Sequence, residues 1–108
     1  MLISVDDLAH VLTDASRIVV VDVRERDEIE RTGVIPTAQH IPLDVLASAL
    51  VNIPLDTTVV CVCATGIRAE IAVERLQTRG FAHVCNVLGG MKKWIASGYA
   101  CDKPYVCA

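Results

Sequence analysis

Two short runs of branched apolar residues constrain the fold more than any other feature of this sequence. Residues 18–23 and 58–62 are dominated by Val and Ile, with hardly a polar side chain among them. A strand with one face in water alternates apolar and polar residues, so nearly continuous runs predict strands buried on both faces of a parallel sheet. Parallel strands need crossover connections, usually helices, and the two runs therefore predict an α/β fold.

The segments around these runs complete the α/β pattern. Weaker strand candidates lie at residues 2–4, 38–41 and 83–87. A first helix is expected after Asp6 or Asp7, either of which could serve as its N-cap. Further helices are expected at residues 24–31, 43–51, 67–79 and 90–97, the last two ending at Gly80 and Gly98. The alternation predicts a sandwich with helices on both faces of the sheet.

Length, charge and cysteine usage exclude several classes of protein. The 108 residues suffice for one domain, and the net charge of −3 comes from scattered charges, which argues against nucleic-acid binding. The longest uncharged stretches are too short for a membrane span, and the first residues do not resemble a signal peptide. The five cysteines form no disulfide framework and no zinc-site spacing. We therefore expect reduced thiols, no metal and a cytoplasmic protein.

The segment Cys63-Ala64-Thr65-Gly66-Ile67-Arg68 stands between the second apolar run and the next predicted helix. Loop N–H groups, a helix N-terminus and a nearby guanidinium all favour a thiolate over a thiol. This is the setting of a nucleophilic cysteine. Cys61 and Cys85, in contrast, fall inside predicted strands and are expected to be small core residues.

Four stretches of the chain together resemble the rhodanese-like sulfurtransferase family in its small single-domain form. They are residues 21–25 with Glu28, residues 33–36, residues 63–69, and residues 86–91 with Trp94 and Gly98. The resemblance covers about residues 2–100. It implies five parallel strands flanked by helices on both faces, and it divides the chain into a domain at residues 1–100 and a tail at residues 101–108.

The resemblance also implies a reaction. Cys63 would take a sulfane sulfur from a donor such as thiosulfate or polysulfide, become a persulfide, and pass the sulfur to a thiol, to cyanide or to a protein acceptor. No cofactor is implied. The N–H groups of the loop would cradle the persulfide or an incoming oxyanion, and Arg68 would close the loop. The residues assigned to this cradle are Ala64, Thr65, Gly66, Ile67 and Arg68.

The charged residues that follow the first apolar run are expected to support the site. Asp22 and Glu28 are the expected partners of Arg24, which would fix the loop beside Cys63. The sequence departs from the family pattern at Val34, where a histidine is usual, and at Thr37, where a glycine is common. It also has Ala64 where many members carry a charged or bulky residue. These differences bear on turn geometry and donor preference.

Two other functions remain open. A related fold hosts phosphatases and arsenate reductases with a cysteine-to-arginine loop, but those loops have one residue more than the four that separate Cys63 from Arg68. The family also includes interaction modules without activity, which commonly lack the cysteine. The tail thiols Cys101 and Cys107 could resolve the persulfide, or could simply belong to a frayed terminus.

Overall fold

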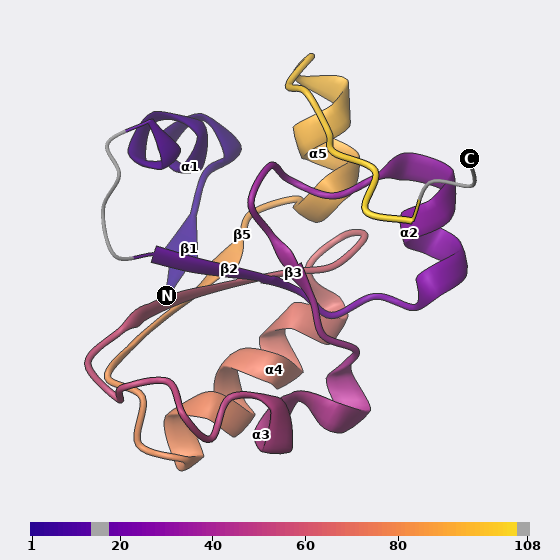
Figure 1. Cartoon of the computed structure of the whole chain (residues 1–108). Helices are drawn as coiled ribbons and strands as arrows, with labels where there is room; N and C mark the ends of the chain where they lie inside the picture. Colours follow the sequence, from indigo (N-terminus) through magenta and orange to yellow (C-terminus); the bar gives the residue numbers. More distant parts are fainter. Residues whose placement is uncertain (14–17, 106–108) are drawn as a thin grey trace.

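The computed structural model describes residues 1–13 and 18–105, which form one parallel sheet with helices on both sides (Figure 1). The five strands lie in the order β1-β5-β4-β2-β3, and every pair is parallel. The strands are β1 (Leu2–Ile3), β2 (Ile18–Asp22), β3 (Gln39–His40), β4 (Thr58–Val62) and β5 (His83–Val87). The predicted fold class is confirmed.

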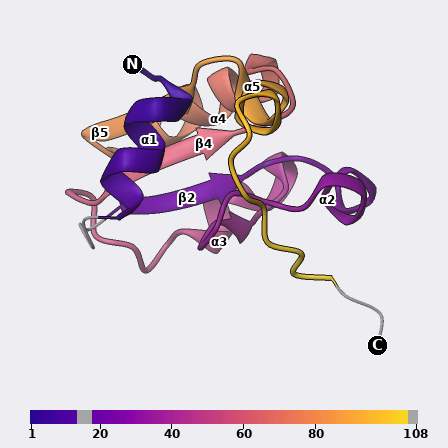
Figure 2. The same cartoon turned by 90° about the horizontal axis from the view of Figure 1, so that it is seen from above.

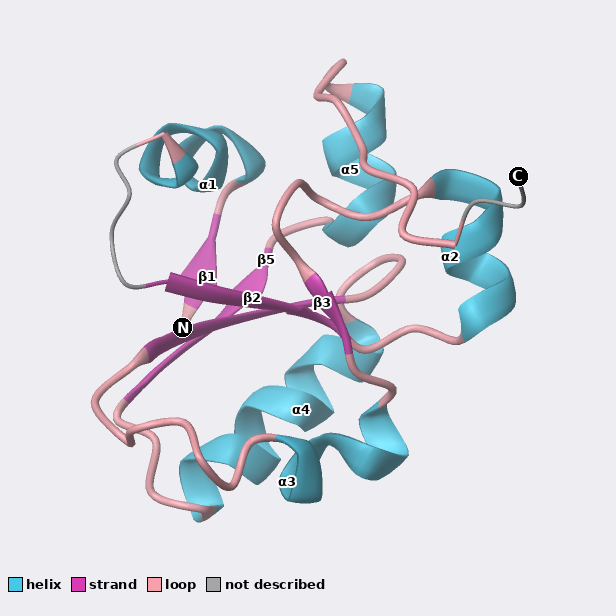
Figure 3. Ribbon diagram, viewed as in Figure 1, coloured by secondary structure: helices cyan, strands magenta, loops and turns pink. Residues whose placement is uncertain are grey.

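The helices pack on the sheet in two layers that bury separate apolar clusters (Figures 2 and 3). Helices α3 (Leu46–Ala49) and α4 (Ile67–Thr78) cover one face, and α1 (Val5–Leu12) and α5 (Gly90–Ala96) cover the other. Helix α2 (Arg26–Thr32) lies beyond the end of β2. No helix among the described residues combines the length and apolar character needed to cross a lipid bilayer.

The two apolar runs form the central strands β2 and β4, as their composition predicts. The strands pair in register from Ile18 opposite Thr58 to Asp22 opposite Val62. Val20 and Val60 face the α1/α5 cluster, whereas Val21 and Cys61 face the α3/α4 cluster. Successive side chains of a strand point to opposite faces, so a strand covered on both sides has to be apolar throughout.

Local capping and turn chemistry differ from the sequence prediction in two places. The first helix begins earlier than expected, because the Ser4 side chain accepts a hydrogen bond from the Asp7 amide at 3.0 Å. Ser4, and neither Asp6 nor Asp7, is therefore the N-cap. The helix expected at residues 43–51 is shorter and in two parts, a 3-10 turn at Leu43–Val45 followed by α3.

Thr37 keeps the turn before β3 although the expected glycine is absent. It is the only non-glycine residue among those described with a positive φ, at 71°. The left-handed conformation costs a β-branched residue about 1–2 kcal/mol. The departure from the family pattern is thus accommodated as strain in the turn, while β3 keeps its pairing with β2.

The C-terminal tail packs against the domain through residue 105. Val34 and Asp102 exchange two backbone hydrogen bonds of 2.8 Å each. The Tyr105 hydroxyl donates to Nδ1 of His40 at 2.6 Å, and the Arg26 guanidinium lies 4.2 Å from the centre of the Tyr105 ring. Cys101 is partly buried by this packing. Cys107, the second thiol considered as a resolving group, lies outside the described residues.

Candidate active site

Cys63 follows β4 directly and leads into the loop that begins α4. Its side chain is only 1% exposed, and its Sγ accepts hydrogen bonds from the backbone N–H of Gly66 at 3.1 Å and of Ala69 at 3.3 Å. Gly66, with φ of 114°, is the N-cap of α4, so both donors belong to the helix N-terminus. Amide donors and the positive end of a helix dipole both stabilise a thiolate.

The start of this loop is anchored by the N-terminus of α5. The amides of Met91 and Lys92 donate to the carbonyl groups of Cys63 and Ala64 at 2.8 and 3.0 Å. Gly90 makes this approach possible, because a Cβ there would lie 2.4 Å from the Cys63 carbonyl oxygen. Two carbonyl groups of the loop, those of Cys63 and Ala64, are thereby bound to α5.

The end of the loop is anchored by β5. The Nδ2 group of Asn86 donates to the Gly66 carbonyl at 2.9 Å, and the Glu70 amide donates to the same oxygen at 3.1 Å. Within the described chain, the amides of Ala64, Thr65, Ile67 and Arg68 donate no hydrogen bond. These unused donors, together with the two on Sγ, give the loop its capacity to bind negative charge.

Arg68 is bound to a carboxylate. Its NH1 and NH2 groups donate to Oε1 and Oε2 of Glu28 at 2.6 and 2.8 Å, so the pair is bidentate. The hydrogen bonds from Arg68 lower the pKa of Glu28 to about 2, and the same contact raises the pKa of Arg68. The guanidinium that was expected to close the loop therefore joins the loop to α2.

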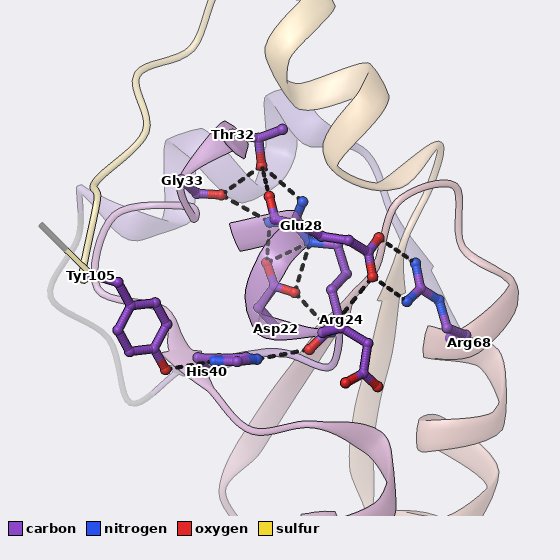
Figure 4. Close-up of polar contacts among 9 residues, drawn as sticks. Asp22, Arg24, Glu28, Thr32, Gly33, His40, Arg68 and Tyr105 are labelled. Atoms are coloured by element: carbon purple, nitrogen blue, oxygen red, sulfur yellow. Dashed lines mark hydrogen bonds and ion pairs between the residues drawn. The ribbon is translucent and has the colours of Figure 1, made fainter. Parts of the chain in front are cut away.

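Arg24 has a different set of partners, as Figure 4 shows. It is 2% exposed, and its Nε and NH2 groups donate to both carboxylate oxygens of the fully buried Asp22 at 2.8–3.1 Å. Its remaining donors bind Thr32 Oγ1 and the Gly33 carbonyl, each at 2.8 Å. Asp22 is the predicted partner, but the predicted pairing of Glu28 with Arg24 is wrong, because Glu28 lies against Arg68.

These contacts assign Arg24 and Glu28 to one support that runs from β2 to the loop. The Asp22–Arg24 pair fixes the C-terminal end of α2 to the end of β2, because Thr32 and Gly33 accept hydrogen bonds from Arg24. Glu28, in the first turn of the same helix, then holds Arg68. Loss of either partner of a buried ion pair costs about 3–5 kcal/mol, because it leaves the other charge buried without its partner.

Cys61 and Cys63 differ in the hydrogen-bond donors around their sulfur atoms. The two cysteines are adjacent on the same face of the strand and pack in the same apolar cluster. Burial raises the pKa of Cys61 to about 12, which keeps it a neutral thiol, and it has no amide donors of the kind that surround Cys63. Cys61 is therefore a packing residue, as predicted.

A groove of about 530 Å³ opens beside the loop. Ala64 and Thr65 form one wall, and α2 and α5 contribute the others. The walls combine the apolar Met91 and Ile95 with charged groups that include Arg31 and Lys92. Within residues 1–13 and 18–105, no three His, Cys, Asp or Glu side chains gather closely enough to hold a metal ion.

The roles of three contributors to the site are missed by reasoning from sequence. Asn86 and Met91 belong to a stretch that carries the family resemblance, but nothing in it predicts that Asn86 or the amides of Met91 and Lys92 bind the loop. His40 is the third, since no pattern in the sequence points to it. Its Nε2 donates to the Arg24 carbonyl at 2.7 Å, and its Nδ1 accepts from Tyr105.

Comparison with known proteins agrees with the geometry. The family model for the rhodanese-like domain matches residues 4–97. A protein of Allochromatium vinosum named sulfurtransferase is 32% identical over 93 residues, which are 86% of each chain. The human single-domain sulfurtransferase TSTD1 is 27% identical, with a TM-score of 0.79 over 87% of this chain and 94% of its own.

A second similar structure carries a different description. It is a Rhodopseudomonas palustris protein described as of unknown function and a possible tyrosine phosphatase, 28% identical, with a TM-score of 0.82 over 92% of this chain and 82% of its own. The match of the family model over most of the sequence decides the family: the chain belongs to the rhodanese-like domain family.

Proposed function

We propose that this chain is a sulfurtransferase that carries a sulfane sulfur on Cys63, with thiosulfate or a polysulfide as donor. The observation that supports this most strongly is the pair of amides, from Gly66 and Ala69, that donate to the Cys63 sulfur. The same donors, with the unused amides of the loop, suit a persulfide anion. The sulfurtransferase names of the relatives agree with this reaction class.

In the first step, the Cys63 thiolate attacks the outer sulfur of thiosulfate. A new S–S bond forms on Cys63, the original S–S bond breaks, and its electron pair leaves with sulfite. The electron pair of the thiolate forms the new bond, and the outer sulfur of the persulfide keeps the negative charge that it carried in thiosulfate. Because the carbonyl groups of Cys63 and Ala64 are tied to α5, the amide side of the loop remains for this charge.

In the second step, a thiophilic acceptor attacks the outer sulfur of the persulfide. With cyanide as acceptor, a C–S bond forms, the S–S bond breaks, and thiocyanate leaves while the Cys63 thiolate is restored. A thiol or a protein acceptor would react at the same sulfur. The groove lined by Ala64, Thr65 and α5 gives such an acceptor a route to the loop.

The alternative of a phosphatase or arsenate reductase is disfavoured by two features of the loop. Only four residues separate Cys63 from Arg68, one fewer than in loops that hold a tetrahedral oxyanion. In addition, NH1 and NH2 of Arg68 are both used by Glu28, so the bidentate face that would bind a phosphate is occupied. The alternative of an interaction module is disfavoured because Cys63 is present and two backbone amides donate to its sulfur.

Replacement of Cys63 by serine tests the proposal. Cys63→Ser removes the nucleophile but keeps a side chain of similar size, and it should abolish thiocyanate formation from thiosulfate and cyanide. Circular dichroism should show the wild-type fold.

The matched control is Cys61→Ala, two residues away on the same strand face. It should keep the activity, with a loss of stability of about 1 kcal/mol from packing. Sulfur transfer by Cys63→Ser at a rate near that of wild type would show that another group carries the sulfur.

A further inference from the structure

Asn86 is a buried polar side chain whose amide is only half used. It lies on β5, is 8% exposed, and donates from Nδ2 to the Gly66 carbonyl at 2.9 Å. Its Oδ1 is buried and has no hydrogen-bond partner in the described part of the chain. A buried acceptor without a partner opposes folding, so an apolar side chain would suit this position better on grounds of stability alone.

The hydrogen bond that Asn86 does make reaches the residue whose N–H faces the sulfur. Gly66 donates to Cys63 Sγ through its amide, while its carbonyl is held by Asn86 and by the Glu70 amide. The φ of 114° is accessible to glycine with little penalty, and so are other values. The tether on the carbonyl therefore restricts a residue that is otherwise free to rotate.

We propose that Asn86 is a positioning residue for Cys63, which acts by fixing the Gly66 peptide so that its N–H remains directed at the sulfur. Gly66 contacts the sulfur and Asn86 contacts Gly66, so Asn86 acts through the loop. The inference deepens the proposed function and rests on it, since it assumes that Cys63 is the reacting group. It explains why an unpartnered acceptor is kept at a buried position of β5.

Two substitutions test this role. Asn86→Leu keeps the branching of the side chain but has neither donor nor acceptor. Asn86→Ala is the second variant, because a smaller side chain also fits at this buried position. We expect both to lower the rate of iodoacetamide alkylation at Cys63 at neutral pH at least fivefold, located by mass spectrometry of the Cys63 peptide. Thiocyanate formation should fall by a similar factor.

The thermal midpoint distinguishes positioning from a general structural role. Because Asn86→Leu removes the unpartnered acceptor, its midpoint should equal or exceed that of wild type while its reactivity falls. Asn52→Leu and Asn52→Ala make the same chemical changes at an exposed asparagine and should leave both readouts unchanged.

Cys63→Ser in the same assay separates failure of this inference from failure of the proposed function. If Cys63→Ser is inactive but folded Asn86→Leu and Asn86→Ala react like wild type, the positioning role is wrong and the proposed function stands. If Cys63→Ser retains transfer, the proposed function fails, and the alkylation rates still decide whether Asn86 acts on Cys63. A loss of reactivity that simply follows a lower thermal midpoint in both Asn86 variants would also overturn the role.

Discussion

Cys61 lies on β4 and Cys63 directly follows this strand, and their different surroundings illustrate how this site is built. Cys61 is enclosed by apolar side chains, and burial raises its pKa to about 12. Cys63 is equally buried, but it has two backbone N–H groups on its sulfur. Burial alone keeps a thiol neutral and unreactive, and the backbone donors on its sulfur are what distinguish Cys63 from Cys61.

The Glu28–Arg68 pair gives the stability of the protein a specific pH dependence. Arg68 lowers the pKa of Glu28 from 4.5 to about 2, so the pair stabilises the folded state fully above about pH 4.5. This contribution to stability is lost as the pH falls from 4.5 through about 2. In this range the unfolded state binds a proton at Glu28 that the folded state does not bind, and falling pH therefore favours unfolding.

Glu28→Gln removes the charge and should lower the free energy of unfolding by about 1–3 kcal/mol at pH 7. The difference from wild type, measured by urea denaturation, should narrow between pH 4.5 and pH 3. Glu30→Gln, on the exposed side of the same helix, is the matched control and should show a smaller effect. A difference for Glu28→Gln that is the same at pH 7 and pH 3 would contradict this origin.

At the scale of elements, the β5–α5 segment binds the loop that joins β4 to α4. Asn86 holds the Gly66 carbonyl, and the first amides of α5 hold the carbonyls of Cys63 and Ala64. The β5–α5 segment thus binds carbonyl groups at both ends of the loop. Helix α2 adds a third attachment through Glu28 and Arg68.

The length of the loop predicts that it binds a persulfide in preference to a phosphate. With four residues between Cys63 and Arg68, wild type should hydrolyse p-nitrophenyl phosphate negligibly. Insertion of one glycine after Thr65 enlarges the loop, and should increase phosphate binding, measured by isothermal titration calorimetry, while lowering sulfur transfer.

An inserted glycine in the loop between Pro54 and Thr57, remote from Cys63, controls for the effect of insertion itself. Vigorous phosphatase turnover by wild type that disappears in Cys63→Ser would contradict the argument from loop length.

At the scale of the whole molecule, the parallel sheet brings together residues that are far apart in sequence. Strands β2, β4 and β5 all run in one direction, so Asp22, Cys63 and the residues after Val87 meet at their carboxyl ends. The tail reaches the same region from the other side, since Tyr105 binds His40, which in turn binds the Arg24 carbonyl. Residues beyond 97, where the family model ends, therefore reach the segment that follows β2 through His40.

The sequence predicts the fold and the position of Cys63 at a strand end well, because both depend on local patterns. Unbroken Val and Ile runs require a doubly covered sheet, and Cys63 stands where one of these runs meets a helical pattern. The partners of Glu28, Asn86 and His40 depend on three-dimensional approach. Whether Glu28 meets Arg24 or Arg68 is decided by the direction of α2, which no spacing in the sequence encodes.

The most direct test of the central claim is mass spectrometry of the protein after incubation with thiosulfate and removal of the excess donor. We expect a gain of about 32 Da, the mass of one sulfur atom, located on the peptide that contains Cys63. The gain should disappear on addition of cyanide, with one thiocyanate released per persulfide, and should be absent from Cys63→Ser. A sulfur adduct on any other cysteine that is lost to cyanide at the turnover rate, with Cys63 unmodified, would contradict the account.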